Sequence, residues 1–217
     1  MRTPAPGLQG MTDVVGVPLS KAAVCTGCGA PRVLPVVCTE CGMIFDIPSD
    51  VFELFGLMRS WAVDIASLER RYDAQSRAFR EKSSARPDSL EKSKAAVEAL
   101  DAARRLLLDP LARAQYLLAS YGGVEREKPV RKREFQSEVM EIDTAFAKAR
   151  QEGDSARLAS AVLEAEEKLA SAIMAAGQSF TRLERSFSEE IGAAADALAE
   201  ARFWRRKVDE LRAGLGG

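Results

Sequence analysis

The chain has 217 residues, a formal net charge of −1 and no histidine. This balance gives no electrostatic argument for binding nucleic acid or a membrane surface, and we expect neither partner. Apolar residues make up 47% of the chain, enough for a core, whereas aromatic residues make up only 6%, which disfavours a β-rich fold. No apolar run approaches the ~18 residues of a membrane span and no signal peptide is recognisable, so we predict a cytoplasmic protein. Because a β-rich fold is disfavoured, we predict a mainly α fold.

The first residues differ in composition from the rest. Residues 1–20 contain several prolines and glycines and show no sustained periodicity, so we predict a disordered leader. Met11 is an alternative start to Met1.

Two C-x-x-C-G motifs follow the leader, and nine residues lie between Cys28 of the first and Cys38 of the second. They contain every cysteine of the chain, namely Cys25, Cys28, Cys38 and Cys41. The two-residue spacing allows both thiolates of a motif to face one ion, and each glycine permits a tight turn. We therefore predict a zinc ribbon over residues 21–47, with Zn²⁺ in a structural role. One alternative is iron, which has the same four ligands in a rubredoxin-like site. Other interpretations are that the cysteines form two disulfides, or that the ribbon has a redox or metal-transfer role.

Residues 48–121 are predicted to contain a hairpin of two long helices. One face of the first helix is apolar, with Ile65, Leu68, Tyr72 and Phe79 at helical spacing. Four arginines lie largely off that face: Arg70, Arg71, Arg77 and Arg80. After a loop around Arg86-Pro87-Asp88, the second helix runs to Leu108. Asp109 can cap a further helix that has Pro110 at its first position.

A linker at residues 122–130 precedes three helical segments in residues 131–217. Their apolar residues recur at alternating spacings of three and four, which is typical of helices packed in a bundle. We expect the first segment to end at Gly153-Asp154, the second at Gly177, and the third to begin near Phe180. The pattern predicts an antiparallel three-helix bundle; the glycine breaks disfavour a continuous coiled coil.

Three short stretches resemble the J domain of the HscB family of iron–sulfur co-chaperones. They are "FELFGL" (52–57), "LERRY" (68–72) and "DPLARAQYLL" (109–118), in the family's order and near its spacing. "LDAARRLLLDPL" is also similar, with Asp101 where an asparagine is usual and Arg104 where an aromatic residue is usual. With the C-terminal segment, the resemblance covers about residues 50–205. It implies a J-like domain followed by a helical bundle; some eukaryotic relatives carry a similar two-motif cysteine ribbon in front.

One departure from the family is large. A working J domain carries His-Pro-Asp between its two long helices, and this chain has no histidine. The tripeptide should fall at Arg80-Glu81-Lys82, and the nearest imitation, Arg86-Pro87-Asp88, comes six residues later. The resemblance therefore implies the fold but leaves stimulation of a chaperone ATPase in doubt.

The resemblance also implies a binding surface for an IscU-like scaffold protein on the first and third bundle helices. The positions that match the family's apolar patch are Gln136, Ser137, Met140 and Phe203. The periodicity gives independent information, because Met140 and Phe203 each lie one position off the apolar stripe of their segment. We expect both at the edge of the core or on the surface, where an apolar side chain can mark a contact site. Single exposed apolar residues are also ordinary on protein surfaces.

The four arginines resemble the basic face by which J domains meet a DnaK/HscA-type chaperone; an ordinary solvated helix face is the alternative. Without histidine, His-based acid–base catalysis and Ser–His triads are excluded, and no Walker or Rossmann glycine pattern is present, so we expect no enzyme. The leading interpretation is an HscB-like co-chaperone. The alternative is a zinc-ribbon and helical-bundle adaptor that has left the chaperone cycle.

Overall fold

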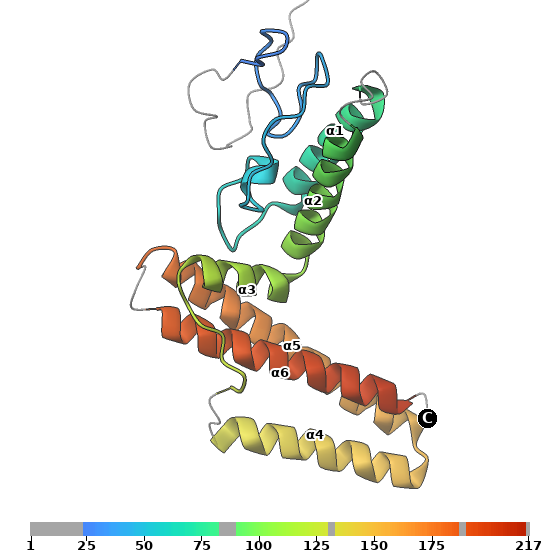
Figure 1. The fold of residues 1–217 in the computed structure, drawn as a ribbon. Helices are drawn as coiled ribbons and strands as arrows, with labels where there is room; N and C mark the ends of the chain where they lie inside the picture. The colour runs from blue at the N-terminus through green and yellow to red at the C-terminus, as the bar shows by residue number, and fades with distance from the viewer. Residues whose placement is uncertain (1–23, 83–89, 130–132, 187–189, 216–217) are drawn as a thin grey trace, which may run out of the picture. The chain divides into compact units, whose positions relative to one another are not determined.

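A computed structural model describes residues 24–82, 90–129, 133–186 and 190–215. The predicted leader and the Arg86-Pro87-Asp88 loop lie outside these residues. The described residues form η1 (Glu53–Phe55), α1 (Ile65–Lys82), α2 (Leu90–Leu108), α3 (Pro110–Ser120), α4 (Arg133–Glu152), α5 (Ser155–Leu183) and α6 (Ile191–Leu215) (Figure 1). The mainly α fold class is confirmed. Among these helices, none combines the length and apolar character needed to cross a bilayer.

The contacts divide the chain into two units. One comprises residues up to Arg59 together with Ile65–Arg104, and the other comprises Ser60–Asp64 together with Arg105–Gly217. The ribbon and the hairpin therefore fall in the same unit. α3 packs on α5 and α6, so it groups with the bundle helices, whereas the boundary expected at residue 121 placed it with the hairpin.

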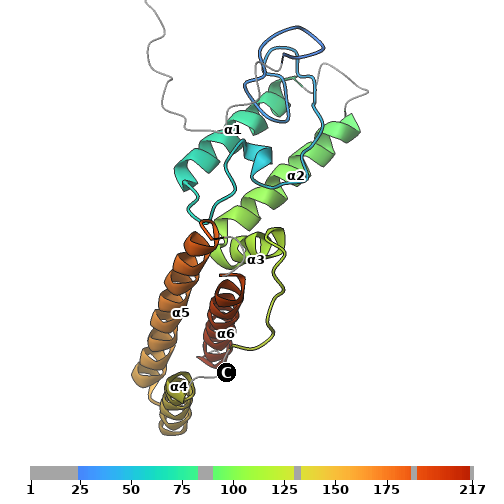
Figure 2. The same ribbon diagram turned by 90° about the vertical axis from the view of Figure 1, so that its left-hand side faces the viewer.

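The N-terminal unit contains the cysteine ribbon, η1, α1 and most of α2. The ribbon has two isolated antiparallel bridges, Val24 with Pro31 and Val37 with Ile44. η1 buries Leu54 and Phe55 and ends at Gly56, whose φ of 60° suits glycine. Gln75 of α1 donates a 2.8 Å hydrogen bond from Nε2 to the carbonyl oxygen of Leu54, which fixes η1 beside α1 (Figure 2).

The C-terminal unit begins its helices as the sequence predicts. Asp109 Oδ1 accepts a 2.8 Å hydrogen bond from the N–H of Leu111, and Pro110 occupies the first position of α3. α4 ends before Gly153, which has φ of 67°, and Asp154 caps α5 by accepting from the N–H groups of Ala156 and Arg157. Successive helices α4, α5 and α6 run in opposite directions (Figure 1). The predicted antiparallel three-helix bundle is confirmed.

The expectation that the second bundle helix ends at Gly177 is wrong. α5 continues to Leu183, so Phe180 and Leu183 belong to α5, and the third bundle helix begins only at Ile191. The reason is a close approach: an added Cβ at Gly177 would overlap Trp61 Nε1 and stand 2.8 Å from Cε2 of the same ring. The glycine makes room for an indole and does not terminate the helix.

Candidate functional site: a four-cysteine cluster and a groove on the bundle

Both cysteine motifs adopt the same tight turn. In the first, the N–H of Gly29 donates to the carbonyl of Cys25 at 2.8 Å, and in the second the N–H of Gly42 donates to that of Cys38 at 3.0 Å. The glycines have φ of 74° and 70°, a region that L side chains rarely adopt. The prediction that each glycine permits the turn is therefore confirmed.

The turns bring the four thiols together. The Sγ atoms of Cys25 and Cys41 are 3.6 Å apart, those of Cys28 and Cys38 are 3.7 Å apart, and all four lie within 4.8 Å of one another. A tetrahedron with metal–sulfur bonds of about 2.3 Å has edges of about 3.8 Å, close to these two spacings. All four cysteines are free. The cluster can hold a metal ion, and its closed thiolate set has no open position for a substrate.

The ionisation of the thiols is uneven. Burial raises the pKa of Cys25, but the N–H groups of Gly27 and Cys28 and hydrogen bonds with Cys41 and Cys38 together outweigh burial and lower this pKa to about 7. The Ala30 N–H lowers the pKa of Cys28, but the neighbouring Cys41 thiol and other effects outweigh it and raise this pKa to about 12. Several thiolates this close repel one another, and a bound cation removes that repulsion.

A groove of about 570 Å³ lies on the bundle between α4 and α6. Its lining residues are Glu127, Lys128, Pro129, Phe135, Gln136, Val139, Met140, Phe203 and Arg206. Three of the four residues matched to the family's patch are therefore brought together. The fourth, Ser137, donates a 2.9 Å hydrogen bond from its hydroxyl to Glu141 Oε1 and does not line the groove.

The groove has a fixed aromatic wall and an exposed apolar rim. The rings of Phe135 and Phe203 meet edge to face with centroids 5.0 Å apart, and Phe203 packs in the same way on the buried Trp204 at 5.6 Å. Met140 is 68% exposed and Phe203 is half-buried, which confirms their expected place at the core edge or surface. Their role in binding stays a prediction.

A buried lysine on α6 ties α4 to α6 close to the groove by pairing with partly exposed carboxylates. Lys207 is 9% exposed, and its Nζ lies 3.0 Å from Asp143 Oδ1 and 3.0 Å from Glu210 Oε2. Burial lowers the pKa of Lys207, but its hydrogen bonds to Asp143 and Glu210 outweigh burial and raise it. The amine therefore remains charged and anchored. Lys207 was not predicted from the sequence as a functional residue; its position next to the apolar residue Val208 was the available signal.

The four predicted arginines of α1 do not share one role. Arg71 donates from Nη1 to the carbonyl oxygens of Phe55 and Gly56, at 2.8 and 3.2 Å, and so holds the end of η1. Arg70 and Arg77 are exposed. Arg80 is exposed as well and donates from Nε to the Ser76 carbonyl at 3.3 Å. Arg71 is thus a structural residue, and its role was not visible from the sequence because the carbonyls lie outside its own helix.

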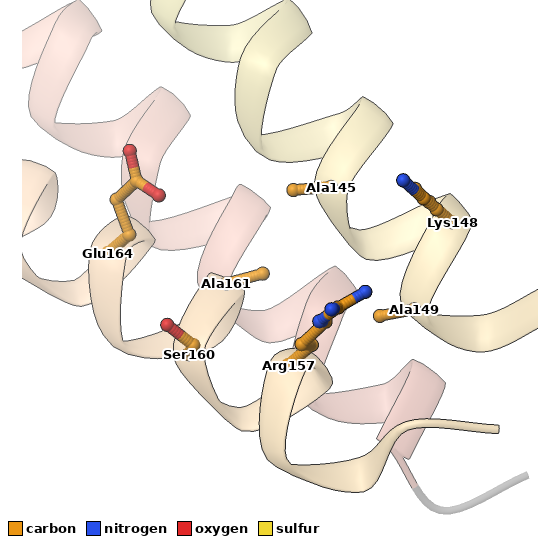
Figure 3. A pocket seen from close by; sticks show the side chains of 7 residues that line it. All are labelled: Ala145, Lys148, Ala149, Arg157, Ser160, Ala161 and Glu164. Atoms are coloured by element: carbon orange, nitrogen blue, oxygen red, sulfur yellow. The ribbon is translucent and has the colours of Figure 1, made fainter. Parts of the chain in front are cut away.

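A second hollow, between α4 and α5, offers no comparable surface. It has a volume of about 210 Å³. Ala145 and Ala149 of α4 face Ala161 of α5 across it, and these small side chains leave the space (Figure 3). Arg157 at its edge is engaged by Glu152 at 2.7 Å and Asp154 at 3.3 Å. We assign no function to this hollow.

Known proteins resemble this chain both in sequence and in structure. No family model matches the chain. The human iron–sulfur cluster co-chaperone protein HscB is 33% identical over 141 residues. The chain is homologous to HscB. The alignment covers 59% of this chain and 59% of the human protein, which is less than two thirds of that relative's length.

The solved structures of HscB share the fold. The crystal structure of human co-chaperone protein HscB superposes with a TM-score of 0.66 at 22% identity, covering 88% of this chain and 98% of that one. Chaperone HscB from Vibrio cholerae gives 0.59 at 24% identity, covering 75% and 95%.

Proposed function

We propose that this HscB homologue is a non-enzymatic co-chaperone of iron–sulfur cluster assembly that acts in the cytoplasm. Its bundle binds an IscU-like scaffold protein through the groove between α4 and α6. One observation carries the proposal: Gln136 and Met140 of α4 and Phe203 of α6 line the same groove. Met140 and Phe203 are the anchors, because apolar side chains at the centre of an interface contribute most of its binding energy.

Binding to an IscU-type scaffold, measured by calorimetry with purified proteins, tests this proposal. Met140→Ala and Phe203→Ala should each weaken binding by roughly 2 kcal/mol or more, as truncations of hot spots do. Ser137→Ala is the matched control on the same helix, since Ser137 does not line the groove. Unchanged binding in the Met140→Ala, Phe203→Ala double variant, with unaltered thermal stability, contradicts the proposal.

The cysteine cluster is proposed to hold one structural Zn²⁺. Residues 24–47 bury few apolar side chains, among them Leu34, Val36 and Val37, and so small a segment needs a metal for stability. Elemental analysis of protein purified under reducing conditions should give one zinc per chain. Iron in place of zinc, or well under one metal per chain, contradicts this assignment.

A second candidate function is an adaptor that has left the chaperone cycle. It is favoured by α1, which continues as a helix through Arg80, Glu81 and Lys82, where a working J domain carries His-Pro-Asp. In the co-chaperone proposal, the basic residues Arg70, Arg77 and Arg80 face a DnaK/HscA-type chaperone. In the adaptor proposal, they form a solvated helix face and no chaperone binds.

A further inference from the structure

The two cysteine motifs are structural repeats that differ at two positions: Gly27 of the first corresponds to Glu40 of the second, and Ala30 corresponds to Met43. In each, the N–H of the first cysteine donates to the carbonyl of the residue after the glycine: Cys25 to Ala30 at 2.8 Å and Cys38 to Met43 at 2.9 Å. Ala30 and Met43 therefore occupy equivalent positions. Only Met43 has a side chain long enough to reach the opposite motif.

Met43 lies across one edge of the thiol cluster. Its backbone is held by the second motif, while its Sδ lies 3.8 Å from Cys25 Sγ and 3.4 Å from Thr26 Oγ1 in the first motif. A Cβ added at Gly27 would stand 3.0 Å from Met43 Sδ, 3.6 Å from Cys41 Sγ and 3.7 Å from Cys25 Sγ. The thioether and the bare Gly27 backbone thus close over the edge between Cys25 and Cys41.

The four thiols differ in exposure. Cys25, which Met43 contacts, is 1% exposed and Cys38 is 2% exposed, whereas Cys41 is intermediate and Cys28 is exposed. Methionine suits a cover of this kind, because its flexible, polarisable side chain fills irregular gaps. Four thiolates already complete a tetrahedral site, so Met43 acts beside the ligands and not as one of them.

We propose that Met43 is a cover that controls metal exchange. It seals the edge between Cys25 and Cys41, so that an incoming chelator or thiol reagent reaches the cluster from the side of Cys28. This inference rests on the proposed metal binding and adds to it a residue that sets how fast the metal is lost. Groups that contact metal ligands without binding the metal commonly alter metal retention strongly.

The test is the rate of zinc transfer from full-length protein to the chromophoric chelator 4-(2-pyridylazo)resorcinol, after metal stoichiometry has been measured for each variant. Met43→Ala should hold one zinc but lose it roughly tenfold faster, within the range seen for residues around metal ligands. Met43→Leu retains the bulk and should stay close to the wild-type rate. Val33→Ala, a control at a 64% exposed apolar residue of the same ribbon, should leave the rate unchanged.

Gly27→Ala supplies an independent variant. Its added Cβ displaces the Met43 thioether and should accelerate release in the natural protein, but not further in the Met43→Ala background. Alkylation followed by peptide mapping gives a second readout: Cys28 should react first in the wild type, and Cys25 and Cys41 should become reactive in Met43→Ala.

The outcomes separate the two proposals. Equal release rates in wild type, Met43→Ala and Gly27→Ala, each holding one zinc, overturn the cover and leave the metal site standing. Acceleration by Val33→Ala equal to that by Met43→Ala also overturns it, because general loosening of the ribbon then explains the effect. Wild-type protein that holds no metal overturns the metal proposal and this inference with it.

Discussion

Trp61 lies against the backbone of Gly177, and no side chain larger than hydrogen fits between them. The indole stacks on Phe180, with centroids 5.6 Å apart and an interplanar angle of 11°. The guanidinium carbon of Arg113 lies 4.9 Å from the centroid of the indole. Glu184 accepts hydrogen bonds from the Ser60 hydroxyl and from the backbone N–H of Trp61. The segment Ser60–Asp64 is therefore an integral part of the C-terminal unit.

Gly177→Ala should destabilise the protein by roughly 1–3 kcal/mol, the usual cost of overpacking a filled site. This is opposite to the ordinary effect of the change inside a helix, where alanine is favoured by about 1 kcal/mol. Gly192→Ala in α6 is the matched control, because the added Cβ would meet only Arg126 Nη2 at 3.7 Å, and it should be neutral or slightly stabilising. Urea unfolding measures both.

The same contact predicts coupling between the two positions. In a Trp61→Ala background, the Gly177→Ala change no longer meets a ring and should lose its destabilising effect. Additive effects of the two substitutions would show that the indole is not the cause.

Tyr72 should make the N-terminal unit sensitive to alkaline pH. Its hydroxyl donates a 2.6 Å hydrogen bond to Asp101 Oδ1, and this bond, followed by burial, raises its pKa above the ordinary 10.0. A raised pKa in the folded state stabilises the protein below the unfolded value, and this stability is lost as pH rises through the folded value. Tyr72→Phe should cost about 1 kcal/mol at neutral pH and reduce the loss of stability above about pH 10. Urea unfolding as a function of pH tests it; an unchanged alkaline slope contradicts the assignment.

Substitutions of Arg71 and Arg77 should differ in their effect on stability, because only Arg71 holds the backbone of η1. Arg71→Ala leaves the carbonyls of Phe55 and Gly56 without their donor, and should destabilise by roughly 1–3 kcal/mol. Arg77→Ala removes an exposed charge and should change stability by less than about 0.5 kcal/mol. Thermal unfolding decides between them, and equal effects would contradict the structural role of Arg71. Chaperone binding is therefore best tested at Arg77.

Stimulation of a DnaK-type ATPase by the natural protein should be weak or absent. α1 continues through Lys82, Glu81 cannot supply the fixed φ of a proline, and Lys82 reverses the charge of an aspartate. Single-turnover ATP hydrolysis measures this, with a variant that carries Arg80→His, Glu81→Pro and Lys82→Asp as the comparison. Strong stimulation by the unmodified protein would refute the expectation. A silent rebuilt variant favours the adaptor function.

The local features of the fold and site were predictable from the sequence. The C-x-x-C-G spacing identifies the cluster because both ligands and the turn lie within five residues, and the Asp109-Pro110 start of α3 depends only on neighbouring backbone groups. The apolar periodicity placed Met140 and Phe203 correctly because exposure follows directly from helical phase.

Features that depend on distant contacts were not predictable. A glycine in a helical pattern marks either an end or a close approach, and only the position of Trp61, more than a hundred residues earlier, decides for Gly177. Contacts with a distant helix also explain the two residues of α2, Asp101 and Arg104, that differ from the pattern usual in HscB. Asp101 accepts from Tyr72, and Arg104 lies over the Tyr72 ring and pairs with Glu69, so both residues face α1.

The place of Ser60–Asp64 has a practical consequence for dissecting the molecule. The C-terminal unit is not a continuous piece of sequence, since five of its residues lie ahead of α1. A fragment that begins at residue 105 would lack the indole, and Phe180 and Gly177 would face solvent where Trp61 packs in the whole chain. Such a fragment should bind hydrophobic dyes and unfold more easily than the same helices do in the intact protein. A peptide spanning residues 60–64, added in trans or fused ahead of the fragment, is the natural way to restore it.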